Sequence, residues 1–289
     1  MANDDFITNL HKGFNFPLDE LREFIQANTD IKVSDFIKIT KGYESEVYEM
    51  GRYMVKICRD GDVSYPCIEW AVSKCKEMGV KVPDILYCGK IGGLDLMIEE
   101  KIDGTPLTPC LYEEAGAELR KIHQIKVNGF WRRHEDGTFD FTNYIDLARS
   151  STRDRLSEMP LICAGGKFSM KDINKMETFL LQAESFDVEP VLNHGDYAPK
   201  HILCGENING IIDFGGFHGS SIYSDLAYFS LNSEEKHFGE FLKGYGEIDS
   251  DKLLGAKVIS LMGYLAHSRK IGDDVDAGRL ELQLAGLLS

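Results

Sequence analysis

The chain has 289 residues, enough for one large domain or for two lobes that share a cleft. Hydrophobic residues make up 43% and charged residues 27%, as in an ordinary globular enzyme. With 32 basic and 47 acidic side chains, the formal net charge is −15. Such a surface repels nucleic acid and anionic membranes and attracts cationic ligands, although the same excess also serves solubility alone.

The cysteines indicate a reducing compartment, and the hydropathy pattern gives no sign of a signal peptide or a membrane span. Seven cysteines are scattered without a C-x-x-C pair, so neither a zinc site nor a disulfide framework is indicated. The first residues, MANDDFITNLHKGF, lack the apolar core of a signal peptide. No apolar run approaches the roughly 18 residues of a membrane span. We therefore expect a soluble, cytoplasmic protein.

The first third of the chain is predicted to be rich in strands. A helix is expected from Leu18, and the segment 36–60 is predicted to form strands broken by turns. Within it, Tyr53, Val55 and Ile57 alternate with Lys56, so the lysine points to the opposite face. A helix over 65–80 follows, and two further strands surround the Gly-Gly turn of 86–102.

The rest of the chain is predicted to be mostly helical. An amphipathic helix is expected over 113–125, followed by a polar, turn-rich segment, 127–141, that is interpreted as an insertion or a lid. Further helices are predicted over 143–156, 170–185, 234–245, 252–271 and 278–288. The pattern predicts a small mixed N-lobe, 1–103, and a larger helical C-lobe, 104–289, joined by a hinge at 99–103.

Two short motifs interrupt the helical half and carry candidate chemistry. HGDYAPKHIL begins at His194, and IIDFGG follows with Asp213 at the end of an apolar run. Phosphoryl transfer needs a carboxylate beside the acceptor hydroxyl, metal ligands, and a cation on the phosphates. Asp196 fits the first role, and Asp213 fits that of a Mg²⁺ ligand, because magnesium prefers carboxylate oxygens. Either aspartate alone would be read as a turn cap.

These motifs, in this order, resemble the aminoglycoside phosphotransferase and choline kinase-like family. The resemblance covers most of the chain and implies an α+β, bilobal protein kinase-like fold. It also implies that Asp196 is the catalytic carboxylate, that Asp213 binds Mg²⁺, and that ATP or GTP is the phosphate donor. SDLAYF, with Asp225, matches a later D-L-A segment of the family, whereas the preceding GSSIYS departs from the usual Gly-Asp-Pro.

His201 stands where the resemblance implies a second metal ligand, at a position usually taken by asparagine. Antibiotic phosphotransferases for macrolides and certain aminoglycosides are similar in having histidine there. A neutral imidazole offers one lone pair, as an amide oxygen does, but nitrogen is a softer ligand than magnesium favours. His201 is therefore expected either to ligate the metal or to order the loop, and we favour ligation.

The N-lobe is expected to supply the nucleotide contacts. The resemblance implies that Lys56, in YMVKI, grips the phosphates and that Glu69, on the following helix, pairs with it. A solvent-exposed Lys–Glu pair is the alternative for either residue alone. KGYESEVY stands where a loop covers the nucleotide, with Gly42 and the Ser45 hydroxyl as phosphate contacts.

LMIEEKIDGTPL resembles the connector between the lobes. Alignment back from Gly104 places the Glu100 carbonyl and the Ile102 amide against the adenine edge. Glu99 then occupies a position that usually carries a larger apolar residue, which leaves the choice between ATP and GTP open.

The acceptor is expected to be a small hydroxyl compound. Net acidity and His201 favour an aminoglycoside-like, cationic antibiotic, and hence a role in antibiotic resistance. Asp273, Asp274 and Asp276, or Glu234 and Glu235, are candidate acceptor surfaces, although solvated loops explain both clusters equally. The alternatives are a metabolite kinase for choline, a sugar or homoserine, and a nucleotide-binding regulatory module without transfer activity.

Overall fold

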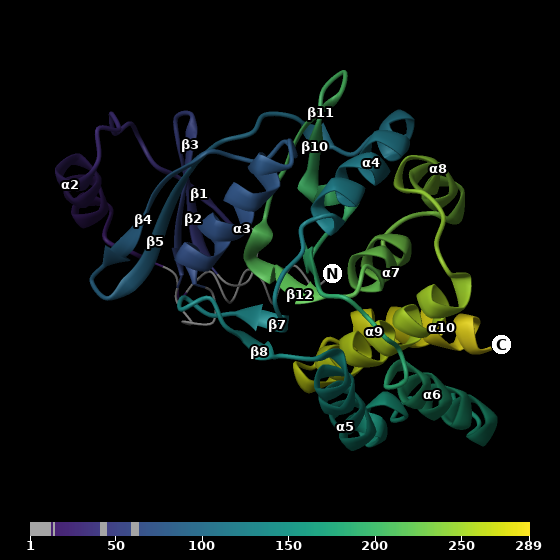
Figure 1. Cartoon of the computed structure of the whole chain (residues 1–289). Helices are drawn as coiled ribbons and strands as arrows, with labels where there is room; N and C mark the ends of the chain where they lie inside the picture. Colours follow the sequence, from purple (N-terminus) through teal and green to yellow (C-terminus); the bar gives the residue numbers. More distant parts are fainter. Residues whose placement is uncertain (1–12, 14, 41–44, 59–63) are drawn as a thin grey trace.

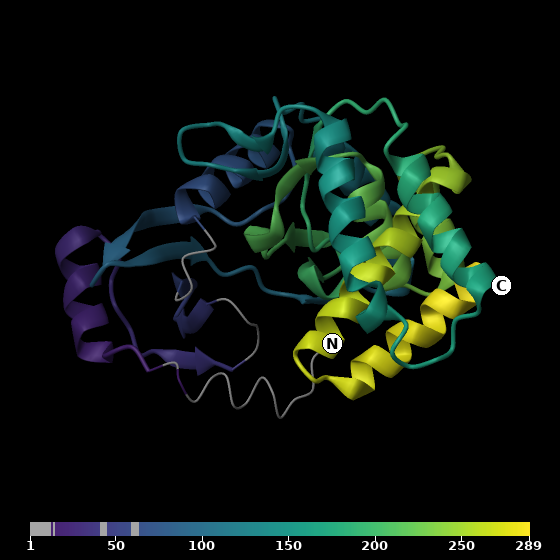
Figure 2. The ribbon, with the colours of Figure 1, turned by 90° about the horizontal axis from the view of Figure 1, so that it is seen from below.

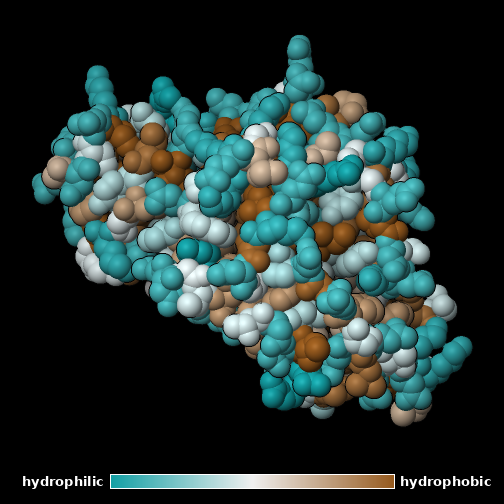
Figure 3. All heavy atoms as spheres, in the orientation of Figure 1, coloured by the Kyte–Doolittle hydropathy of each residue, from teal (hydrophilic) through white to brown (hydrophobic). Residues whose placement is uncertain are grey.

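The computed structural model describes residues 13, 15–40, 45–58 and 64–289. It shows a smaller lobe built around one antiparallel sheet and a larger, mostly helical lobe (Figure 1). The α+β, two-lobed organisation expected from the sequence is therefore confirmed. Hydrophilic side chains cover most of the face seen in Figure 3.

The described residues of the small lobe form five antiparallel strands in the order β1-β2-β3-β5-β4. They are β1 (Ile37–Ile39), β2 (Ser45–Met50), β3 (Tyr53–Cys58), β4 (Ile85–Ile91) and β5 (Leu94–Glu100). Strands β4 and β5 form a hairpin because Gly92 and Gly93 both have positive φ, 56° and 86°, as the tight turn requires. Helices α2 (Leu18–Asn28) and α3 (Tyr65–Glu77) accompany the sheet.

The alternation in β3 divides the sheet into two faces. Val55 and Ile57 are fully buried in a core with Leu21 and Ile25 of α2. Lys56 lies on the other face, in register with Met97 of β5. Met97 belongs to a second core, which runs from α3 into the large lobe. The face predicted for Lys56 is therefore the one that looks away from the α2 core.

The helices of the large lobe are α4 (Tyr112–His123), α5 (Tyr144–Ile162), α6 (Met170–Ala183), α7 (Tyr223–Leu231), α8 (Glu235–Tyr245), α9 (Ser250–Lys270) and α10 (Asp274–Leu288). Helices α5, α6, α9 and α10 share an apolar core of their own. They lie together at the side of the lobe away from α2 (Figures 1 and 2). None of the helices in the described residues is long and apolar enough to cross a membrane.

Two small sheets carry the loops between these helices. One has the order β11-β10-β6, with β6 (Thr105–Pro106), β10 (Ile202–Cys204) and β11 (Ile208–Ile211). The other has the order β8-β7-β12-β9, with β7 (Phe130–Arg133), β8 (Phe139–Phe141), β9 (Val191–Asn193) and β12 (His218–Ser220). Short 3₁₀ turns lie at η1 (Pro109–Leu111), η2 (Pro199–His201) and η3 (Phe214–Gly216).

The segment interpreted as an insertion or lid is the β7–β8 hairpin. It lies beside α3 in both ribbon views (Figures 1 and 2), and Glu135 and Arg133 contact the small lobe. Ser64 Oγ donates to Glu135 Oε1 at 2.8 Å. The Arg133 guanidinium lies 4.3 Å from the centre of the Trp70 ring, a cation–π contact. The hairpin thus links the large lobe to α3.

Candidate active site

The loop that carries Asp196 begins where β9 ends. His194, Gly195 and Asp196 follow Asn193, and the chain then turns through η2 into β10. Gly195 has a φ of 85°, and a Cβ there would lie 1.8 Å from the carbonyl oxygen of Gly216. Any larger residue would therefore separate the two loops that bear Asp196 and Asp213.

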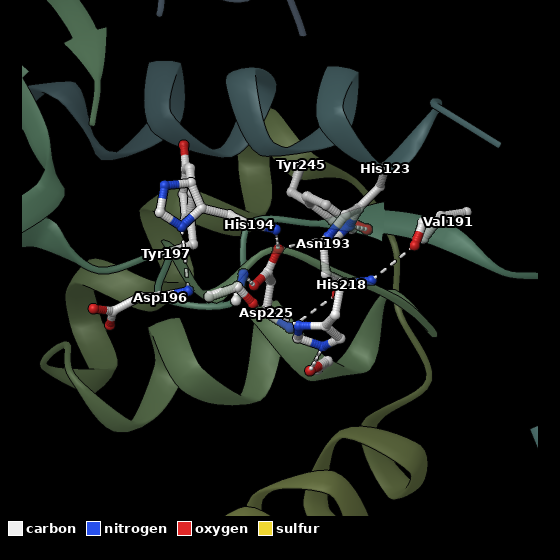
Figure 4. A network of polar contacts seen from close by, with 12 residues as sticks. His123, Val191, Asn193, His194, Asp196, Tyr197, His218, Asp225 and Tyr245 are labelled. Atoms are coloured by element: carbon white, nitrogen blue, oxygen red, sulfur yellow. Dashed lines mark hydrogen bonds and ion pairs between the residues drawn. The ribbon is translucent and has the colours of Figure 1, made fainter. Parts of the chain in front are cut away.

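Asp225, from the first turn of α7, anchors this loop from behind. Its carboxylate accepts hydrogen bonds from the backbone N–H groups of His194 (2.7 Å) and Gly195 (2.8 Å). His123 of α4 approaches the same carboxylate at 3.3 Å (Figure 4). Burial raises the pKa of Asp225, but the hydrogen bond from His123 and the surrounding imidazoles outweigh it, so the net pKa is lowered. A fully buried carboxylate thus stays ionised and holds the loop.

His194 orients the loop through hydrogen bonds at both ring nitrogens and is not placed as a base. Its Nε2 lies 3.0 Å from the Ile212 carbonyl oxygen, and its Nδ1 accepts from the Asp196 N–H at 3.2 Å. A carbonyl oxygen only accepts, so the ring hydrogen sits on Nε2. Burial lowers the pKa of His194, which keeps the ring neutral and able to make both bonds.

The Asp196 side chain points away from this network (Figure 4). Its Oδ1 is buried and has no hydrogen-bond partner among the described residues. Its Oδ2 lies 3.6 Å from Lys200 Nζ and 3.3 Å from His201 Nδ1. A buried carboxylate oxygen without a donor is costly in a folded protein, and a bound ion or water is one way to satisfy it.

Asp213 reaches the same place from the other motif. It follows the buried β11 and precedes η3, with a left-handed backbone (φ 70°) that residues other than glycine rarely adopt. Such strain concentrates at functional sites. Partial desolvation raises the pKa of Asp213, but Lys56 and the imidazoles of His201 and His194 outweigh it, so its pKa is lowered.

Asp196, His201 and Asp213 meet in one cluster whose ligand atoms all lie within 4.8 Å of one another. His201 Nδ1 lies 2.9 Å from the Asp196 carbonyl oxygen, so Nδ1 carries the hydrogen. The lone pair of Nε2 then faces Asp213 Oδ2 at 3.4 Å. Two acceptor atoms at this separation are stabilised by a shared cation. The donor set therefore fits a metal, with two oxygen ligands of the kind magnesium prefers.

Lys56 differs from the expected pairing. Its Nζ lies 2.7 Å from Glu99 Oε1, and the structure records no ion pair between Lys56 and Glu69, both of which are described residues. The register explains the contact, because Lys56 pairs with Met97 and Glu99 is the next residue of β5 on that face. Glu69 is exposed on α3, beside Cys88 of β4.

The structure describes three of the other four expected nucleotide contacts. The Ser45 hydroxyl is hydrogen-bonded to the Tyr65 hydroxyl at 2.8 Å, and Gly42 falls outside the described residues. In the connector, the Glu100 N–H donates to the Asp84 carbonyl at 2.8 Å. The Ile102 side chain covers Gly210 of β11, where a Cβ would lie 2.3 Å from Ile102 Cδ1. The roles of these four residues toward a nucleotide stay predictions.

A comparison with models of protein families identifies the family of this chain. Residues 35–256 match the model of the phosphotransferase enzyme family, APH. The chain belongs to this family. An aminoglycoside 3′-phosphotransferase of Niallia circulans is 26% identical over 200 residues, which is 60% of this chain and 69% of that protein.

Solved aminoglycoside phosphotransferases share the fold. A ternary complex of an APH(4)-Ia variant with AMP-PNP and hygromycin B superposes with a TM-score of 0.73 at 16% identity, covering 92% of this phosphotransferase and 97% of that chain. The GDP and kanamycin complex of APH(2″)-IIIa gives a TM-score of 0.69 at 16% identity, covering 94% and 98%.

Two tyrosines near Asp196 were missed by the sequence reasoning. Tyr228 of α7 and Tyr264 of α9 form an edge-to-face pair with ring centres 5.9 Å apart. Burial, followed by the Asp196 carboxylate, raises the pKa of both phenols. Tyr228 stands in SDLAYF, three residues after Asp225, so the helical spacing of that segment was the available signal.

The acidic clusters considered as acceptor surfaces are helix starts. Asp273 is buried and caps α10 by accepting from the Asp276 N–H, and Asp276 pairs with Arg279. Glu234 precedes α8 and pairs with Lys236. Carboxylates at helix N-termini interact favourably with the helix dipole, so these positions have a structural explanation.

Proposed function

We propose that this phosphotransferase moves the γ-phosphoryl group of ATP or GTP to a hydroxyl group of a small molecule, with Mg²⁺. The observation that carries the proposal is the convergence of Asp196, His201 and Asp213, from two separate loops, on one cluster. An unpartnered carboxylate oxygen on Asp196 adds to it. The fully buried carboxylate of Asp225, by contrast, accepts a backbone N–H on each of its two oxygens.

Each residue would then act through its position. Asp196 would accept a hydrogen bond from the acceptor hydroxyl and take its proton as the new O–P bond forms and the bond from the γ-phosphorus to the departing ADP or GDP breaks. Asp213 and His201 would hold Mg²⁺, which supplies charge neutralisation on the β- and γ-phosphates when it is bound. Lys56 would grip the phosphates with an ammonium that stays charged. Burial lowers its pKa, but the carboxylates of Glu99 and Asp213 outweigh burial and raise it.

For the acceptor, we favour a cationic, aminoglycoside-like compound. The net charge of −15 favours the approach of cations. The relative from Niallia circulans is an aminoglycoside 3′-phosphotransferase, and the two solved neighbours were determined with hygromycin B and with kanamycin. Tyr228 and Tyr264 offer an aromatic wall beside Asp196 for the ring of such an acceptor.

The test is release of ADP or GDP in the presence of Mg²⁺ across a panel of aminoglycosides, macrolides, choline, sugars and homoserine, with Asp196→Ala as the blank. Turnover with aminoglycosides, absent in the variant, is the expected result. Turnover with choline, a sugar or homoserine would instead identify a metabolite kinase. Nucleotide binding without turnover on any compound would indicate a regulatory module and contradict the proposal.

A further inference from the structure

The ion pair between Lys56 and Glu99 is nearly removed from solvent. The side chains are 17% and 7% exposed, and the charged atoms lie 2.7 Å apart. Their strands, β3 and β5, are central in the five-stranded sheet, so neither side chain can leave this face without breaking the sheet. Glu99 is also the last residue but one of β5, directly before the connector to the large lobe. The pair is thus held by regular backbone and not by a mobile loop.

Glu69 has a different environment. It lies on α3, and its side chain is exposed. Burial and then the nearby Glu69 carboxylate raise the pKa of the Cys88 thiol of β4. Cys88 is in register with Met97, and Met97 with Lys56, so one strand separates Glu69's neighbour from the lysine. A partner on α3 would also depend on the position of the helix, whereas Glu99 depends only on strand register.

Glu99 helps to keep the largely buried Lys56 side chain charged. Burial lowers the pKa of Lys56, but the carboxylates of Glu99 and Asp213 raise it above its ordinary value, so the side chain stays an ammonium. Glu99 is the carboxylate that contacts Lys56, and it lies on the strand that leads into the connector. Removing one partner of a buried ion pair destabilises a protein by much more than the intact pair stabilises it, because the remaining charge is left buried and unpaired.

We propose that Glu99 is the positioning residue for Lys56, in place of Glu69. Its carboxylate holds the ammonium extended along the sheet face and charged, ready for the phosphates of the nucleotide. This inference rests on the proposed function, because it takes Lys56 to be the phosphate-gripping residue.

The experiment compares binding of Mg-ATP, or of Mg-GTP if that is the nucleotide bound, with binding of the corresponding nucleoside, by calorimetry. Glu99→Gln keeps the shape of the side chain and removes the charge. We expect it to weaken nucleotide binding by roughly ten- to a hundredfold while nucleoside binding changes little, since only the nucleotide has phosphates for Lys56 to hold. In Glu99→Gln, KM for the nucleotide should rise by a similar factor.

Two control variants accompany it. Asp95→Asn removes another carboxylate from the same face of β5, where Asp95 pairs with Lys90 at 2.8 Å, and should leave both affinities unchanged. Glu69→Gln should have a smaller effect than Glu99→Gln. In a Lys56→Met background, Glu99→Gln should cause no further loss of nucleotide affinity, because the group it positions is gone. Thermal unfolding confirms that each variant compared is folded.

The outcomes separate the two proposals. A wild-type protein that binds the nucleoside and the nucleotide equally, or neither, contradicts the proposed function itself. A wild-type protein with phosphate-dependent binding that Glu99→Gln leaves intact overturns only the role of Glu99. So does a variant that binds the nucleotide more tightly, or one that loses nucleoside and nucleotide affinity in parallel. A larger loss of nucleotide affinity in Glu69→Gln than in Glu99→Gln would show that Glu69 of α3 positions Lys56.

Discussion

At the scale of single residues, the site depends on side chains whose partners are incomplete. Asp196 has a buried oxygen without a donor, and His201 turns a lone pair toward Asp213. Asp213 itself has a strained backbone. Each feature costs stability, and together they surround one small volume. A cation in that volume would relieve all of the electrostatic cost at once.

Substitution of His201 tests the interpretation that this cluster binds a metal ion. His201→Asn places an amide oxygen where the imidazole nitrogen lies, so the Mg²⁺ concentration for half-maximal activity should stay near that of the wild type or fall. His201→Ala removes the ligand and should raise that concentration roughly tenfold. Magnesium titration of nucleotide binding gives the same information without turnover. An alanine variant with unchanged magnesium dependence would assign His201 to ordering the loop.

At the scale of elements, the catalytic loop is held by α7. Asp225 accepts two backbone N–H groups of the loop and a contact from His123, and it is fully buried. The loop therefore keeps its shape only while α7, α4 and β9 remain packed together. The geometry of the site therefore depends on the packing of the core of the large lobe.

Asp225→Asn should reduce the free energy of unfolding by about 1–3 kcal/mol, because the amide offers one acceptor oxygen where two N–H donors are placed. Chemical denaturation measures the loss. Asp251→Asn, in the exposed first turn of α9, is the matched control and should have little effect. Activity should fall in Asp225→Asn even where the protein is folded. Equal stability of the two variants would argue against the anchoring role.

Much of the element order could be predicted from the sequence, and the contacts between elements could not. The alternation around Lys56 gave its face, and the two aspartate motifs gave the loops that now meet at the metal cluster. The pairing of Lys56 with Glu99 depends on the register of two strands about forty positions apart, which hydrophobic periodicity does not encode. The sequence could not decide whether the β7–β8 hairpin is an insertion or a lid. Its contacts with the small lobe are made by Arg133 and Glu135 and form only when the chain has folded.

At the scale of the whole molecule, buried imidazoles connect stability to pH. Burial lowers the pKa of His194 and His218 below the ordinary value of 6.5. Between that value and the lower pKa of the folded state, the unfolded chain binds more protons than the folded protein does. The free energy of unfolding therefore falls as the pH drops below about 6.5.

We expect this fall to reach up to about 1.4 kcal/mol per pH unit for each of the two imidazoles. Urea unfolding at a series of pH values from neutral to mildly acidic measures it. His218→Asn should reduce the slope, and His267→Asn, at an exposed position of α9, should leave it unchanged. A wild-type protein whose stability is constant across this range would show that these rings are not buried in the neutral form.

The central claim is that Asp196 serves phosphoryl transfer at this cluster, and product analysis tests it most directly. The acceptor identified by turnover is incubated with Mg²⁺ and nucleotide, and its mass is measured after reaction with the wild type and with Asp196→Asn. The account predicts gain of one phosphoryl group with the wild type, a rate lower by roughly 10²–10⁴-fold in the variant, and unchanged nucleotide binding. A variant that phosphorylates the acceptor at the wild-type rate would contradict it.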